Sequence, residues 1–203
     1  MGNLAYTVTD LILGLAVVTC AVRLLTVPAV HRYWHMTFWF AGAGAFAGAA
    51  HHGLFNTGAS WIAVGVLVVI AISYYLIASA REVLSRRWTR IVAVIRGVGV
   101  AAYGAAVAVG ESGLLPLLLC ESLTMASILG LWLYAGHVGH PMAVPMAVAI
   151  SVNALAGVVF ALPASLTTPI GLDSTALSHL AQIPGMLLLY RAVVRGTRSR
   201  QLR

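Results

Sequence analysis

Apolar stretches long enough to cross a lipid bilayer fill almost all of this 203-residue chain, and basic residues gather only at alternate breaks between them. A membrane-spanning helix needs about 20 apolar residues, and seven such stretches can be placed. All twelve Lys or Arg positions are arginine, and they form three groups near the ends of the first, third and seventh stretches. They are Arg23 and Arg32, then Arg81, Arg86, Arg87, Arg90 and Arg96, and finally Arg191, Arg195, Arg198, Arg200 and Arg203.

This charge pattern predicts a membrane topology. Loops on the cytoplasmic side are enriched in Lys and Arg, so seven spans put the N-terminus outside and the C-terminus inside. We expect an all-α, multi-pass cell-membrane protein with a single seven-helix transmembrane domain at residues 1–194 and a basic cytoplasmic tail at 195–203. The predicted spans cover residues 7–27, 37–56, 60–80, 91–109, 114–136, 144–162 and 174–194.

Composition narrows the class of protein and of partner. With 61% apolar and 8% charged residues, the chain does not fit a soluble globular protein. The net charge of +7 is explained by topology and by contact with anionic lipid headgroups at the Arg-rich inner face. We therefore expect membrane lipids as partners and no nucleic acid. The use of Arg in place of Lys, with abundant Ala and Val, is typical of a GC-rich bacterial genome. The sequence does not predict the oligomeric state.

Ionisable and amide side chains on four predicted spans reach a similar depth below the outer surface. Asp10 lies one turn into the first span, and His52 lies about a turn from the outer end of the second. Glu121 lies about 10 Å into the fifth. His179 and Gln182 share a face of the seventh span, because they are three residues apart. Ionisable groups inside a membrane are costly and usually face each other, water or a metal.

Two histidines and a carboxylate form a ligand set for zinc or another divalent metal, with a position left open for water. We expect His52 and His179 as metal ligands, with Asp10 or Glu121 as third ligand or general base. Metal-bound water is a nucleophile for hydrolysis, and Gln182 is a candidate for orienting it. The plain alternatives are a histidine hydrogen-bonded within the core and an Asp10 that only caps the first helix. Asp173 is most simply the N-cap of the seventh span.

A stripe of small residues bears on which neighbouring histidine faces the bundle. Gly44, Gly48 and His52 are spaced by four residues, so they lie along one side of the second helix. Small residues let another helix approach closely. This spacing favours an inward His52, with His51, about 100° away, as the alternative.

Three short motifs carry a resemblance to a known family. They are Thr9-Asp10 in the first span, Ala50-His51-His52-Gly53 closing the second, and Asp173-Ser-Thr-Ala-Leu-Ser-His179-Leu-Ala-Gln182 opening the seventh. Together they resemble a family of small bacterial seven-helix membrane proteins over the whole chain. The resemblance implies that His52, His179 and Gln182 act together.

More distantly, the chain is similar to the CREST superfamily of seven-helix membrane hydrolases, which includes the alkaline ceramidases. Zinc in that superfamily is held by a histidine in the second span and a His-x-x-x-His pair in the seventh. His52 and His179 match the first two of these ligands, whereas Ile183 stands at the third. The superfamily's serine before the first histidine and aspartate in the third span have no counterpart.

These observations predict a metal-dependent membrane hydrolase that acts on a lipid-like substrate at an outer-leaflet His/Asp site. One alternative is an acid-initiated membrane terpene cyclase, with Glu121 or Asp10 as proton donor. Phe46, Phe55, Trp61, Tyr103 and Phe160 would then stabilise the carbocation. A second alternative is a non-enzymatic protein that binds a small molecule, haem or an ion. The seventh span contains no Lys, which excludes a retinal Schiff base.

Overall fold

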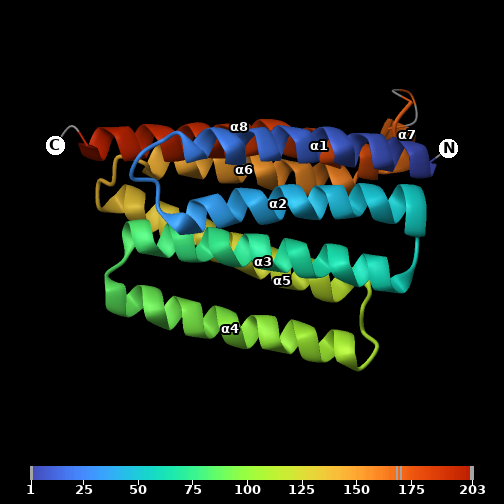
Figure 1. Cartoon of the computed structure of the whole chain (residues 1–203), viewed down its shortest axis with the longest axis horizontal. Coiled ribbons are helices and arrows are strands. Elements are labelled where there is room, and N and C mark those ends of the chain that lie inside the picture. Colours follow the sequence, from blue (N-terminus) through green and yellow to red (C-terminus); the bar gives the residue numbers. More distant parts are fainter. Residues whose placement is uncertain (1, 168, 170, 202–203) are drawn as a thin grey trace.

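The computed structural model describes residues 2–167, 169 and 171–201, and these residues form helices and turns without a strand. Eight α-helices and one π-helix run in the chain order shown in Figure 1. Their bounds are α1 (Gly2–Leu25), α2 (Arg32–Ala50), η1 (His51–Phe55), α3 (Gly58–Val83), α4 (Arg86–Ala108), α5 (Leu114–His137), α6 (Ala143–Phe160), α7 (Ala164–Thr167) and α8 (Ser174–Gln201).

Seven long helices run back and forth along the bundle, and the two termini lie at opposite ends of it (Figure 1). Six of the seven are long and apolar enough to cross a membrane. The exception is α2, whose first turn contains Arg32 and His35 and whose second half is rich in Gly and Ala. The chain is therefore an all-helical protein with six clear candidate membrane helices.

The prediction of seven helices needs correction. The described residues contain eight α-helices, because α7 forms a single short turn before α8. The second helix begins at Arg32, five residues before the predicted span, and ends in the π-helix η1. The basic segment expected to be a tail from residue 195 continues α8 as far as Gln201.

The core lies between α1, α2, α3, α5, α6 and α8, and α4 lies at the edge, beyond α3 and α5 (Figure 1). Two tryptophans in the core direct their indole N–H groups to polar partners. Trp132 Nε1 donates to Ser79 Oγ at 3.0 Å, and Trp34 Nε1 donates to Glu82 Oε1 at 3.2 Å. The largest fully buried side chains include Leu24, Trp34, Phe38, Ile128, Trp132, Met146, Ile150 and Leu189.

Close packing of α1 against α2 depends on glycine. A Cβ atom at Gly42 would lie 2.6 Å from Val18 Cγ2, and one at Gly14 would lie 2.9 Å from the Phe46 ring. Helices in lipid gain little from hydrophobic burial against each other, so close approach through small residues is a main source of their association. These glycines set the distance between the helix that carries Asp10 and the helix that leads to His52.

Replacing Gly42 by leucine should therefore loosen the α1–α2 contact. We expect Gly42→Leu to lower the free energy of unfolding in detergent by about 1–3 kcal/mol, the usual cost of overpacking. Gly104→Leu on α4 is the matched control, because Gly104 is exposed and no atom lies within 4 Å of its Cβ position. Equal stability of the two variants, measured by denaturant titration, would contradict this packing.

Candidate functional site

One carboxylate lies between two imidazoles at the end of the bundle that contains the N-terminus. Asp10 on α1 directs Oδ1 to His179 Nδ1 on α8 at 3.2 Å. Its other oxygen, Oδ2, lies 3.9 Å from His52 Nε2 on η1. We call Asp10, His52 and His179 the Asp10 cluster. Three segments far apart in the sequence thus converge on one acid.

A second contact bears on which nitrogen of His179 carries the proton in its neutral form. Thr9 Oγ1 lies 3.2 Å from His179 Nδ1, and it is placed to donate to the Ala5 carbonyl oxygen at 2.9 Å. A hydroxyl has one proton, so towards His179 the Thr9 oxygen acts as acceptor. The carboxylate of Asp10 is also an acceptor. We therefore infer that neutral His179 carries its proton on Nδ1, which leaves the lone pair on Nε2.

The sequence after α2 brings His52 to the acid. A π-helical turn accommodates an extra residue and is often found at functional sites. Here it spans His51–Phe55 and ends at Asn56, which adopts the left-handed conformation with φ 45°. Gly48 provides the space, since a Cβ atom there would lie 2.7 Å from Asp10 Oδ2. Tyr6 packs edge-on against His52, with ring centroids 5.0 Å apart.

His51 has a different position from its neighbour. Its Nδ1 lies 2.7 Å from Ser60 Oγ, and its ring packs against Trp61 at a centroid distance of 5.6 Å. Ser60 is part of the capping box that starts α3, in which its backbone N–H donates to Thr57 Oγ1 at 3.2 Å. His51 therefore ties η1 to α3, and His52 is the histidine beside Asp10.

The start of α8 determines where His179 lies along the bundle axis. The Ala176 backbone N–H donates to Asp173 Oδ1 at 2.8 Å, which confirms Asp173 as the N-cap. His179 follows within the second turn of the helix. The Asp173 carboxylate also interacts with the Tyr6 hydroxyl, which links this cap to α1.

Exposure differs between the acid and the two bases. The Asp10 side chain keeps 7% of its surface exposed, whereas the His52 and His179 side chains keep 19% and 17%. The carboxylate therefore lies behind the imidazoles, and the imidazoles are the groups that a bound molecule would reach first. Such an arrangement can orient a histidine and stabilise its charged form.

The other two predicted site residues do not contact this cluster. Glu121 is on α5, which packs against α3, α4 and α6, whereas the cluster is formed by α1, η1 and α8. Gln182 is half-buried one turn after His179, and no hydrogen bond joins it to Asp10, His52 or His179 within the described structure. The sequence predicts depth along a helix but not which helices are neighbours, so it grouped Glu121 with residues of a different helix interface.

The predicted metal site does not form a ready-made ligand group among the described residues. Across residues 2–167, 169 and 171–201, no group of three or more His, Cys, Asp or Glu residues is arranged to hold a metal ion. Catalytic zinc sites usually have three protein ligands. With Asp10 bound to the inner nitrogen of His179, the groups facing outward are two imidazoles.

Two features of the site had only weak sequence signals. Thr9 precedes Asp10 in the motif, but its contact to His179 depends on the approach of α8 to α1. The π-turn at His51 has no distinct residue pattern. Its nearest signal is Asn56, a residue type that tolerates the left-handed conformation at the end of a helix.

Comparison with known proteins places the whole bundle in one family. Residues 5–198 match DUF6962, described as a family of unknown function. The chain belongs to the DUF6962 family. No curated protein and no solved structure matches it. The match spans α1 to α8, so the Asp10 cluster lies inside the region that defines this DUF6962 member.

The tautomer of His179 is directly measurable. We expect nitrogen-15 NMR of histidine-labelled protein to show neutral His179 protonated at Nδ1, because Asp10 and Thr9 both accept there. The resonance is assigned by its loss in His179→Gln, with exposed His137 as reference. A neutral His179 protonated at Nε2 would contradict the geometry of the cluster.

Proposed function

We propose that this protein is a membrane-embedded hydrolase that cleaves an ester or amide bond in a lipid-like substrate. The observation that supports this most is the Asp10–His179 pair, in which a buried carboxylate binds Nδ1 and leaves Nε2 free to act as a base. The same carboxylate–imidazole arrangement activates nucleophiles in well-studied hydrolases.

The pair supports a complete reaction with water as the only co-reactant. His179 Nε2 takes a proton from a water molecule as the water oxygen bonds to the substrate carbonyl carbon. Asp10 stabilises the imidazolium through the Nδ1 proton. The proton on Nε2 then passes to the leaving oxygen or nitrogen as its bond to carbon breaks. An acid and an alcohol or amine are released.

His52 has a second role in this scheme. It lies on the other side of Asp10 and has an exposed imidazole edge. We assign it to hydrogen bonding of the substrate carbonyl oxygen, where negative charge develops in the transition state. Gly48 serves the reaction indirectly, because its lack of a side chain leaves room for the Asp10 carboxylate.

The position of the cluster favours a substrate from the bilayer. Asp10 lies about 12 Å along α1 from its first residue, within a helix apolar enough to span a membrane. If the Arg-rich end of the bundle is cytoplasmic, as the positive-inside pattern predicts, the site opens near the outer leaflet. The resemblance to membrane hydrolases of the CREST type, which share the histidines corresponding to His52 and His179, points to the same chemistry.

A metal-dependent form of this hydrolase is our second candidate function. The similar hydrolases use a third ligand four residues after the histidine of the last span, and this chain has Ile183 there. With two outward imidazoles, the cluster is better suited to acid–base chemistry than to holding zinc. Gln182, half-buried one turn after His179 on α8, remains a candidate for contacting a substrate or water.

The other functions predicted from the sequence are less well supported. A haem with two axial histidines must fit between the imidazoles, but here both contact the carboxylate of Asp10. A terpene cyclase needs aromatic rings around its carbocation. Trp61 instead packs on His51, and Tyr103 lines a cavity beside the Arg96 guanidinium, whose charge would repel a carbocation.

Hydrolysis can be tested with purified protein in lipid nanodiscs and a panel of fluorogenic long-chain esters and amides. We expect activity to fall by about 10²–10⁴-fold in Asp10→Asn and in His179→Ala, the range that positioned acid–base groups contribute. His52→Ala should lower kcat more than it raises KM, because its bond forms mainly in the transition state.

Two variants serve as controls for this assay. His137→Ala replaces an exposed histidine at the opposite end of the bundle, and Glu121→Gln tests the acid on α5. Both should retain wild-type activity. A chelator should also leave activity unchanged. Loss of activity on chelation would favour the metal-dependent form, and a panel without any turnover would contradict the hydrolase proposal.

A further inference from the structure

Arg96 is an arginine within the membrane region, away from the loops where the other arginines gather. It lies ten residues after Arg86, about 15 Å along α4. It is 7% exposed and is the only buried residue of α4. The sequence pattern grouped Arg96 with the flanking arginines, and the structure corrects this. The enrichment of arginine in cytoplasmic loops therefore does not explain why Arg96 is buried within α4.

The guanidinium of Arg96 joins α4 to α3 and α5 through neutral groups. Nε donates to Ser73 Oγ at 2.7 Å, and Nη2 donates to the Val69 carbonyl oxygen at 3.2 Å. Nη1 donates to Thr124 Oγ1 at 2.7 Å and to Cys120 Sγ at 3.3 Å. Arginine has five N–H groups and a thiol is a weak acceptor. One of the five N–H groups makes none of these bonds, and another makes only the weak bond to Cys120. Both can bind a stronger acceptor.

No described acid neutralises this charge. No salt bridge joins Arg96 to any Asp or Glu of the described chain, and Glu121, beside Cys120 on α5, is not within ion-pair distance. A buried charge is costly unless it is paired, and charged residues within membrane helices usually mark the path of an ion or substrate. An anion bound beside Arg96 would neutralise this charge.

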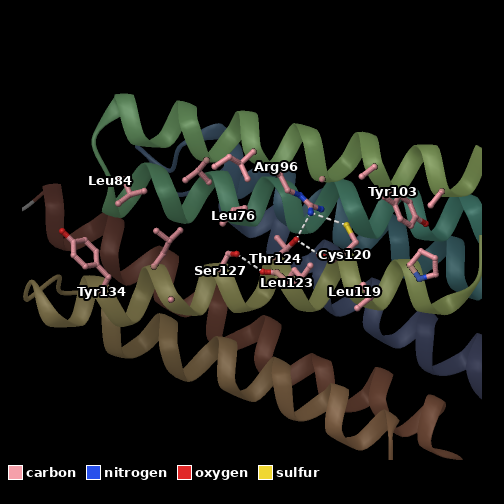
Figure 2. A pocket seen from close by; sticks show the side chains of 18 residues that line it. Leu76, Leu84, Arg96, Tyr103, Leu119, Cys120, Leu123, Thr124, Ser127 and Tyr134 are labelled. Carbon is pink, nitrogen blue, oxygen red and sulfur yellow. Dashed lines mark hydrogen bonds between the residues drawn. The ribbon is translucent and has the colours of Figure 1, made fainter.

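A cavity of about 850 Å³ opens beside Arg96 between α4 and α5 (Figure 2). This volume is within the range of small-molecule sites, about 300–1,000 Å³. Leu84 and Tyr134 lie towards one end of the cavity, and Tyr103 lies towards the other, with Arg96 between them. On α4 the lining runs from Val92 to Ala106, about 21 Å along the helix. Apart from Arg96 and a few hydroxyl and thiol groups, the walls are apolar.

We propose that this cavity binds a single-chain amphiphile with a carboxylate head, such as a long-chain fatty acid. The carboxylate would accept two N–H bonds from Arg96, a pairing that guanidinium geometry favours. The thiol of Cys120 would give up its weak bond. The hydrocarbon chain would lie along the apolar wall formed by Leu119, Leu123 and Ala102. A membrane helix from a partner protein is far larger than this cavity, so we assign it to a lipid-like molecule.

This site is separate from the Asp10 cluster. The cavity is lined mainly by α4 and α5, with Leu76 of α3, whereas α1, η1 and α8 carry the cluster. The proposal therefore does not depend on hydrolase activity, and its test measures binding alone.

Binding can be measured by native mass spectrometry of delipidated protein released from detergent micelles. The probes are hexadecanoate, hexadecan-1-ol and hexadecyl phosphate. We expect one hexadecanoate per chain, bound at least about tenfold more tightly than the alcohol, because only the carboxylate pairs with the guanidinium. Arg96→Gln should abolish this preference. Arg90→Gln, which changes an exposed arginine on the same helix, should retain it.

A second variant tests the cavity if Arg96→Gln does not fold. Gly130 lines the cavity with open space at its Cβ position, and Ala102 lines it from α4. The double variant Ala102→Phe/Gly130→Phe fills the cavity on both sides of Arg96 without replacing any of its partners, and should abolish hexadecanoate binding. Equal affinity for acid and alcohol, or binding unaffected by filling the cavity, would overturn the proposal. Tighter binding of hexadecyl phosphate would overturn the assignment to a carboxylate.

Discussion

Polar groups inside a bilayer must find partners within the protein, and this requirement explains how Asp10 and Arg96 are placed. Asp10 is buried, and α1 brings its carboxylate close to the two segments that carry imidazoles. That closeness depends on Gly48, where any side chain would meet the carboxylate. The need to place the Asp10 carboxylate beside its partners thus determines how closely α1 approaches η1 and α8. The same close approach positions His179 to act as a base.

The arginine within α4 shows the opposite solution. Arg96 is surrounded by neutral acceptors and faces an apolar cavity, so its charge is solvated without being neutralised. Because it is the only buried residue of α4, it also holds that helix against α3 and α5. Two polar centres among the described residues thus differ in kind: one has an acid between two bases, and the other has a cation without an acidic partner.

Much of the fold could be predicted because the length of each apolar stretch and the spacing of the arginines can be read directly along the sequence. They gave the long helices. The small-residue stripe favoured His52 as the inward histidine; His52 is the one beside Asp10, but His51 is the more buried of the two. The motifs also selected Asp10 and His179, which the structure brings together. Glu121 matched their depth but lies on a helix that does not border α1, because the arrangement of helices around the bundle is absent from their apolar pattern. For the same reason, the isolation of Arg96 from any acid could not be predicted.

The account rests on Asp10 and His179 acting as one unit, and a double-mutant cycle on stability measures this most directly. The free energy of unfolding in detergent would be determined for wild type, Asp10→Ala, His179→Ala and the double variant. Groups in direct contact should give a coupling energy of about 0.5–3 kcal/mol, so the double variant should lose less stability than the sum of the single losses. Additive losses would mean that the two residues do not interact, and would contradict the proposed site.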